Sequence, residues 1–211
     1  MGRCVIVYGK SGSGKSRSLK NFGENEIFLA NVTSKDLPFR KNFKYSCKLD
    51  VSSAIINGLR KMPTNVAVID DATFIMVNAF MRGHGGKTNQ FDLYNNIADS
   101  MFAIFEETAK LPDDVIVYVI LHENENDNGL IKLKTIGKLL DDKCPMESLV
   151  TVCLRCMTDG TRHYFRTQSD GFDISKSPED MFELEIDNDL AMVDNTIRGY
   201  YGLEPRKQVL K

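Results

Sequence analysis

Short, continuous apolar runs recur along the chain, separated by longer segments in which apolar and polar positions follow a helical spacing. The clearest runs cover residues 4–8, 65–69 and 115–121. Unbroken apolar runs of this length are typical of strands that are buried on both faces of a parallel sheet. Less uniform runs predict two further strands, at 26–32 and 44–49.

The intervening segments predict helices. Residues 94–110 place Ile97 and Met101, among other apolar side chains, on one face of an amphipathic helix. Glycines at 83–86 separate this segment from the helix expected before it. The other predicted helices cover residues 15–22, 51–61, 72–82 and 190–201.

Near the carboxyl end, strands are expected at 149–156 and 162–167, on either side of Asp159 and Gly160. An Asp-Gly pair suits a tight turn between antiparallel strands, so these segments predict a β-hairpin. The alternation of buried strands and helices predicts an α/β fold, a mainly parallel sheet flanked by helices with the hairpin as an antiparallel addition. The length of 211 residues suits a single domain over 1–211.

Composition narrows the expected location. Hydrophobic residues make up 42% of the chain, and no apolar run approaches the roughly 20 residues that cross a bilayer, so we expect no membrane partner. The first predicted strand begins at residue 4, which leaves no room for a cleavable signal peptide. The five cysteines are an odd, scattered set, which suits reduced thiols. These features predict a cytoplasmic protein.

Two further features limit the chemistry. The net charge of -2 means that the whole surface does not attract polyanions, so a nucleic acid would have to meet local basic loops. Cys153 and Cys156 spell C-x-x-C, but they lie in a predicted strand, where side chains three residues apart point to opposite faces. We therefore expect neither a zinc site nor a redox pair there.

A glycine-rich loop follows the first predicted strand and matches G-x-x-x-x-G-K-[ST] in full. Its glycines allow successive backbone N–H groups to face phosphate oxygens, and the following helix adds its N-terminal dipole. Lys15 is expected to reach the β- and γ-phosphates, and the Ser16 hydroxyl to bind Mg²⁺. The motif predicts a site for ATP and Mg²⁺, and the residues expected to line it are Gly9, Lys10, Ser11, Gly12, Ser13, Gly14, Lys15, Ser16 and Arg17.

Polar residues that end neighbouring strands supply the other candidate catalytic groups. Asp70 follows four apolar residues and is the expected magnesium-side carboxylate. Asp71 is a candidate to orient the attacking water, or alternatively an N-cap for the helix at 72–82. His122 ends the strand at 115–121 and is placed to sense the γ-phosphate or polarise the water, unless it is only a polar cap.

In several segments, in this order, the chain resembles the small RecA-like ATP-binding proteins of bacteriophages, close to the Sak-type single-strand annealing proteins. The resemblance extends over nearly the whole length. The segments are GKSGSGKS (9–16), VAVIDDATFIM (66–76), LPDDVIVYVILHENE (111–125), KTIGKLLDDK (134–143), TQSDGFDISKSPEDMF (167–182) and IDNDL (186–190). It implies a RecA-type core that hydrolyses ATP, assembles into a ring or filament, and acts on single-stranded DNA in phage recombination within the host cytoplasm.

The resemblance also implies which segments face DNA, namely residues 82–90 and 124–138. The basic residues expected to contact DNA there are Arg82, Lys87, Lys132, Lys134 and Lys138. Solvated lysines in ordinary loops are the alternative. Aromatic residues for stacking bases are missing from both segments, and only Phe91 and Tyr94 lie just beyond the first.

One position departs from the RecA pattern. Such enzymes carry a catalytic glutamate at the end of the strand after the P-loop helix, but here this region reads Asn31-Val-Thr-Ser-Lys-Asp36. Either Asp36 or Asp71 takes over the role, or hydrolysis is slow. The resemblance further assigns Lys176 to a subunit interface, where it would act on the γ-phosphate bound by a neighbour. The alternative is a surface lysine in a loop.

Two other functions compete with an ATP-dependent recombination protein. A non-catalytic ATP switch could load or regulate a replication partner. A P-loop nucleotide kinase is disfavoured because kinases bring arginines over the phosphates on a lid, and the arginines of this chain are scattered.

Overall fold

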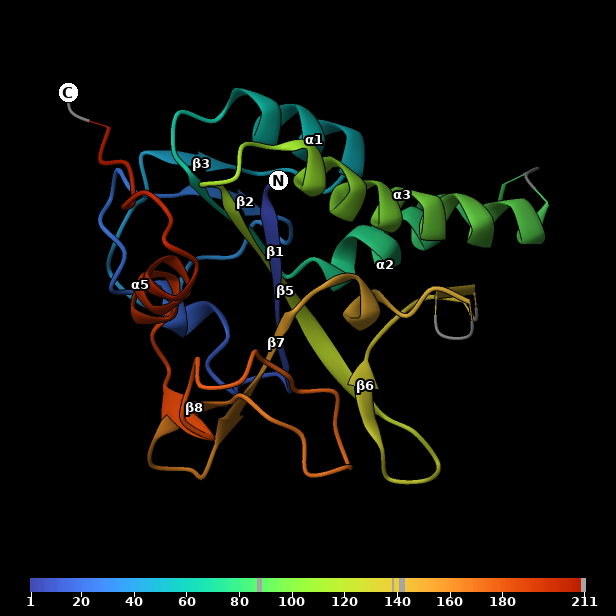
Figure 1. The fold of residues 1–211 in the computed structure, drawn as a ribbon. Coiled ribbons are helices and arrows are strands. Elements are labelled where there is room, and N and C mark those ends of the chain that lie inside the picture. Colours follow the sequence, from blue (N-terminus) through green and yellow to red (C-terminus); the bar gives the residue numbers. More distant parts are fainter. Residues whose placement is uncertain (87–88, 138, 141–142, 210–211) are drawn as a thin grey trace.

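A computed structural model describes residues 1–86, 89–137, 139–140 and 143–209, and its strands join one twisted sheet (Figure 1). Within the described residues, the order across the sheet is β3-β2-β4-β5-β1-β7-β8-β9, with β6 added to the outer part of β5. None of the described helices combines the length and apolar character that crossing a bilayer demands.

Parallel strands form the centre of the sheet. They are β1 (Arg3–Gly9), β2 (Phe28–Asn31), β3 (Tyr45–Cys47), β4 (Val66–Asp70), β5 (Ile116–Glu125) and β7 (Val152–Thr158). Antiparallel pairs occur at the margins and involve β6 (Ile131–Leu133), β8 (His163–Arg166) and β9 (Glu185–Asp187). The predicted α/β class, the mainly parallel sheet and the hairpin of β7 and β8 are therefore confirmed.

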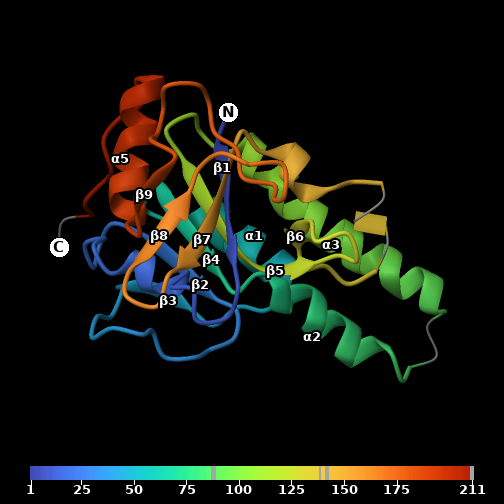
Figure 2. The same ribbon diagram turned by 90° about the horizontal axis from the view of Figure 1, so that it is seen from below.

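Helices cover both faces of the sheet (Figure 2). On one face lie α1 (Ser52–Lys61), α2 (Thr73–Gly83) and α3 (Gln90–Lys110), and on the other α5 (Leu190–Tyr201). Alternate residues of β1 serve the two cores: Ile6 packs in the first and Val7 in the second, both fully buried. Burial on both sides explains why the central strands are continuous apolar runs.

The C-x-x-C residues follow the same alternation. Cys153 belongs to the core under α1–α3 and Cys156 to the core under α5, and both thiols are buried and free. The expectation that these side chains point to opposite faces of a strand is confirmed.

The helix expected at 15–22 is the main error of the sequence prediction. The structure has only a short 3₁₀ helix, η1 (Ser16–Leu19). The Ser18 hydroxyl donates to the Lys15 carbonyl at 2.5 Å, a local bond by which serine competes with a continuing helix. Asn21 and Gly23 follow, and asparagine also favours local bonds while glycine loses backbone entropy in a helix. The helix-dipole contribution expected for this loop is correspondingly small.

Other boundaries differ where polar residues continue an element. Strand β5 extends through Glu125, beyond the apolar run, because Glu123, Asn124 and Glu125 pair with β6 in an antiparallel arm. This arm occupies much of the segment expected to be a loop at 124–138. Helix α3 begins at Gln90, before the predicted start at 94, because the Asn89 side chain caps it by accepting from Phe91 N.

The strand order brings the candidate site together. Strand β5 lies between β1 and β4, and the register sets Gly9 opposite His122 and Asn31 opposite Asp70. The carboxyl ends of these parallel strands therefore meet at one edge, where ligands of open α/β sheets bind.

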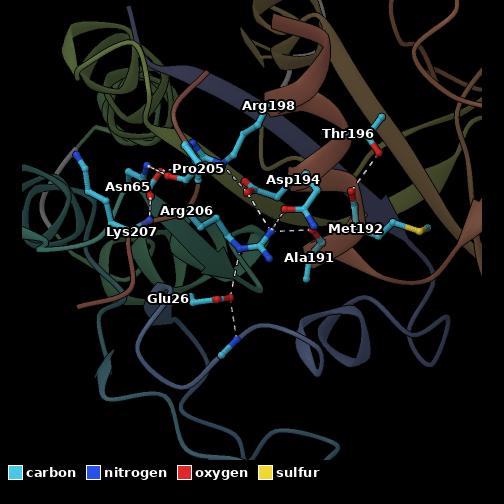
Figure 3. Close-up of polar contacts among 12 residues, drawn as sticks. Glu26, Asn65, Ala191, Met192, Asp194, Thr196, Arg198, Pro205, Arg206 and Lys207 are labelled. Carbon is cyan, nitrogen blue, oxygen red and sulfur yellow. Dashed lines mark hydrogen bonds and ion pairs between the residues drawn. The ribbon is translucent and has the colours of Figure 1, made fainter. Parts of the chain in front are cut away.

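The opposite edge is closed by the segment that follows α5 (Figure 3). Arg206 extends between Glu26 and Asp194, with Nε 3.2 Å from Glu26 Oε2 and Nη1 3.3 Å from Asp194 Oδ2. Buried Arg198 donates to Asp194 Oδ2 at 2.7 Å and to the Asn65 carbonyl at the start of β4. This buried ionic network holds the terminal segment far from the edge that carries the phosphate-loop motif.

Candidate functional site

The glycine-rich loop leaves β1 in a conformation that depends on its glycines. Gly12 and Gly14 have φ of 80° and 101°, values that other residues rarely adopt. A Cβ on Gly14 would also lie 2.7 Å from His163 Nδ1. Among the described residues, no hydrogen-bond acceptor pairs with the backbone N–H of Gly14, Lys15 or Ser16. These donors are what a phosphate group requires.

Lys15 is folded back onto its own loop. Its Nζ donates to the carbonyls of Gly9 at 2.9 Å and Lys10 at 2.8 Å, and the residue is only 6% exposed. Burial lowers the pKa of this ammonium. A phosphate anion beside the loop offers Lys15 a stronger, charged acceptor than either carbonyl.

Ser16 and Asp70 meet across the end of the sheet. Ser16 Oγ donates to Asp70 Oδ1 at 3.0 Å, although the two residues are far apart in the sequence. Burial, and secondarily the charge of Asp71, raises the pKa of the Asp70 carboxyl to about 6. A hydroxyl and a buried carboxylate in contact form a hard-oxygen pair of the kind Mg²⁺ takes beside a nucleotide, so the residues fit that ion.

Asp71 faces the cavity and does not cap a helix. Helix α2 has Ala72 as its N-cap with no side-chain cap bond, so the N-cap alternative is wrong. Asp71 adopts φ of 59°, and its carboxylate accepts from Thr33 Oγ1 at 3.0 Å and lies 3.2 Å from His122 Nε2. Partial burial raises its pKa, but these two hydrogen bonds and nearby charges outweigh burial and hold the pKa below its usual value.

His122 is oriented from two sides. Its backbone N–H donates to Thr73 Oγ1 at 2.9 Å, and the Phe74 ring packs edge-on, with ring centroids 5.9 Å apart. A polar cap at the end of the strand would not explain the main contact of His122, which is the pairing of its imidazole with the Asp71 carboxylate. Together Asp71 and His122 form a carboxylate–imidazole pair that can orient a water and move a proton.

The sequence did not predict several of the contacts made by the glycine-rich loop and Arg17. His163 Nδ1 lies 2.7 Å from the Ser13 carbonyl, and the Cys156 thiol donates to the same oxygen at 3.1 Å. Arg17 was expected here, but its contact with Asn188 Oδ1, at 3.2 Å, was not. These partners come from the hairpin and the segment after it, and no local pattern marks them.

These groups enclose a cavity of about 320 Å³ at the carboxyl edge of the sheet. Its lining residues are Ser11, Gly12, Gly14, Lys15, Ser16, Arg17, Lys35, Pro38, Asp71, His122 and His163. Asp70 lies beneath this lining through its bond to Ser16, and the Ser13 hydroxyl is buried without a partner within the described residues. Asp36 and Asp71 were the two candidates to replace the catalytic glutamate of RecA-type enzymes. Asp71 lines the cavity, whereas Asp36 is exposed and does not.

The residues expected to contact DNA have mixed surroundings. Lys87 and Lys138 lie outside the described residues. Arg82, at the end of α2, is paired with the Asp50 carboxylate. Lys132 lies on β6 opposite Asn124, half-buried, and Lys134 follows β6 and is exposed.

An aromatic groove is lined by residues 135–137, from the second segment expected to face DNA, and by Phe80 and Phe91, which lie on either side of the first segment in the sequence. It has a volume of about 670 Å³. Phe80 and Tyr94 stack in it with ring centroids 5.8 Å apart, and Phe91 is 69% exposed. The other lining residues are Asn95, Thr135, Ile136, Gly137, Leu139 and Lys143. The sequence indicated only Phe91 and Tyr94, because Phe80 arrives from α2 through tertiary packing.

Lys176 lies away from the cavity of its own chain. Its backbone forms an isolated bridge with Cys153, with Cys153 N donating to Lys176 O at 2.8 Å and Lys176 N to Cys153 O at 2.9 Å. Cys153 is three residues before Cys156, which contacts the glycine-rich loop. The side chain of Lys176 is half-buried. A role for Lys176 at the phosphates of its own subunit is not supported by this position.

No known family model matches the chain, and no curated protein is significantly similar to it.

Proposed function

We propose that this protein binds ATP with Mg²⁺ and hydrolyses it. The observation that carries the proposal is the 3.0 Å hydrogen bond from Ser16 Oγ to Asp70 Oδ1. It joins the hydroxyl that ends the phosphate-loop motif to the acid that ends β4, the two oxygen ligands expected for magnesium. A glycine-rich turn without a ligand gives no reason to bury an acid beneath it at 5% exposure.

In the proposed reaction Lys15 exchanges its bonds to the loop carbonyls for the β- and γ-phosphate oxygens. Ser16 and Asp70 would hold Mg²⁺, which would neutralise charge on the phosphates. Asp71 and His122 orient a water for in-line attack on the γ-phosphorus. The new O–P bond forms as the bond to the β,γ-bridging oxygen breaks, ADP leaves with that electron pair, and the water's proton passes to the Asp71–His122 pair.

We further propose that the protein is a RecA-like ATPase acting on single-stranded DNA in phage recombination or replication, as a homo-oligomer. The aromatic groove supports this part, because exposed rings can stack bases without reading their sequence. Lys132 and Lys134 on the arm and Lys143 in the groove supply cations for the phosphates. Lys176 remains a proposed interface residue that acts on a neighbour's nucleotide.

One observation favours a second candidate, an ATP-dependent switch that turns over slowly. The loop after β2 brings no carboxylate into the cavity, since Asp36 is exposed and outside the lining. Water activation then depends on Asp71, whose low pKa makes it a weak base.

An ATPase assay with and without single-stranded DNA separates these functions. We expect magnesium-dependent phosphate release that rises on adding DNA and is lost in Lys15→Ala. Tight ATP binding with negligible release under both conditions would favour the switch. Phosphate transfer to an added nucleotide, instead of to water, would indicate a kinase.

A further inference from the structure

The turn after β2 packs against Asp71, the carboxylate proposed to orient water. The Asn31 side chain donates to the Lys35 carbonyl at 2.7 Å, and Ser34 takes the left-handed conformation, with φ of 58°. The turn contacts Asp71 Oδ2 twice, through Thr33 Oγ1 at 3.0 Å and Lys35 Nζ at 3.9 Å. These local bonds fix where the Lys35 side chain starts.

Lys35 lines the cavity from the turn after β2, a segment separate from the glycine-rich loop. Its Nζ lies 5.3 Å from the centroid of the Phe74 ring, the same ring that packs against His122. The ammonium is thus held by a carboxylate and an aromatic face, beside the pair expected to orient water. Its side chain is 69% exposed, so its ion pair with Asp71 is weak and open to exchange for a phosphate.

The other lysine and arginine side chains of the cavity have different partners and come from a different segment. Lys15 binds the carbonyls of its own loop, and Arg17 donates to Asn188 on the hairpin side. Both come from the phosphate loop and the 3₁₀ helix behind it, whereas Lys35 comes from a separate turn and lines the cavity with Asp71 and His122.

We propose that Lys35 is a catalytic residue that contacts the γ-phosphate of nucleotide bound in its own subunit and stabilises the charge that develops there during transfer. This rests on the proposed function. Each subunit then carries its own charge-stabilising lysine, in the turn after β2.

The test compares Lys35→Ala with Lys35→Arg and with Lys48→Ala. The last variant removes an exposed lysine that directly follows β3. Calorimetry measures affinity for ADP and for a non-hydrolysable ATP analogue, each with Mg²⁺, and phosphate release gives kcat. We expect Lys35→Ala to lose about tenfold in analogue affinity, as for a lost charge-assisted hydrogen bond, with ADP affinity unchanged. Its kcat should fall roughly 10²-fold.

The controls distinguish contact from support of the fold. Lys35→Arg keeps the positive charge and should retain the preference for the ATP analogue over ADP, and Lys48→Ala should match the parent in every measurement. Equal losses for ADP and the analogue in Lys35→Ala, or unchanged analogue affinity, would overturn the assignment. If the parent bound the analogue but released no phosphate, hydrolysis would fail as the function, while the two affinities would still decide the role of Lys35.

Discussion

At the scale of single residues, the carboxyl edge gathers charges that are poorly satisfied without a ligand. Asp70 is 5% exposed and next to Asp71, and its pKa of about 6 reflects burial more than any neighbour. Lys15 is buried as well, and its pKa is lowered. Such sites are expected to lower the stability of the free protein in exchange for binding.

This view predicts that Asp70→Asn stabilises the protein in EDTA at pH 8. Because the folded pKa of about 6 exceeds the ordinary value of 3.8, the folded state binds more protons between these pH values. Stability should fall as pH rises through that window, and ionised Asp70 should cost about 3 kcal/mol above it. The gain in Asp70→Asn should disappear below about pH 4, once both states are protonated.

Urea unfolding of both proteins at a series of pH values measures this difference. Asp99→Asn, on the exposed part of α3, provides a control that should leave the free energy of unfolding unchanged within about 0.5 kcal/mol. A variant at position 70 that is less stable than the parent at pH 8 would show that the carboxylate is structural.

The sequence predicts only part of this residue set. Lys15, Ser16 and Asp70 follow from motif and strand pattern, because backbone geometry at a strand end dictates them. Lys35 and His163 cannot be found this way, since tertiary packing brings them from polar segments that lack periodicity.

At the scale of elements, sequence prediction succeeds where burial is complete. Strands β1 and β4 and helix α5 were predicted to within one or two residues, because apolar runs and caps define them. It fails where local polar bonds or strand pairing decide, as in η1 and in the arm of β5 and β6. The arm is polar and pairs outside the apolar core, so its sequence resembles a loop.

The arm carries a prediction about DNA. Replacing Lys132 and Lys134 together by alanine should weaken single-strand binding and reduce the slope of log affinity against log salt by about 1.4, roughly 0.7 for each lost phosphate contact. Fluorescence anisotropy with a labelled oligonucleotide at several salt concentrations measures both. The control is the pair Lys48→Ala and Lys61→Ala, two exposed lysines outside the arm, which should leave the slope unchanged. An unaltered slope in the arm variant would remove the arm from the DNA interface.

At the scale of the whole molecule, the carboxyl and amino ends of the parallel strands form two edges of the sheet with different roles. The carboxyl edge holds the cavity, and the amino edge is closed by the terminal segment and the network of Arg198, Asp194 and Arg206 (Figure 3). Tyr118 donates to Asp194 from the middle of the sheet at 3.1 Å, which ties α5 to the central strand β5. The division follows from topology, since every central strand runs in the same direction.

Arg198→Met should therefore destabilise the fold without altering the site. The substitution removes one partner of the buried Arg198–Asp194 ion pair. Removing one member of a buried pair costs about 3–5 kcal/mol of stability, because the other charge stays buried with weaker partners. Arg162→Met, in an exposed ion pair, should cost less than about 1 kcal/mol. Urea unfolding measures both, and nucleotide affinity well below the melting temperature should stay at the parent value. A cost for Arg198→Met no larger than that for Arg162→Met would mean that the network does not hold the terminal segment.

The central claim is that the glycine-rich loop and Asp70 form one site for ATP and Mg²⁺, and isothermal titration of ATP tests it most directly. We expect saturable binding at one site per chain with Mg²⁺, an affinity at least about tenfold lower in EDTA, and no measurable binding by Lys15→Ala. Binding by Lys15→Ala at the parent affinity, or no binding by the parent protein itself, would contradict the account.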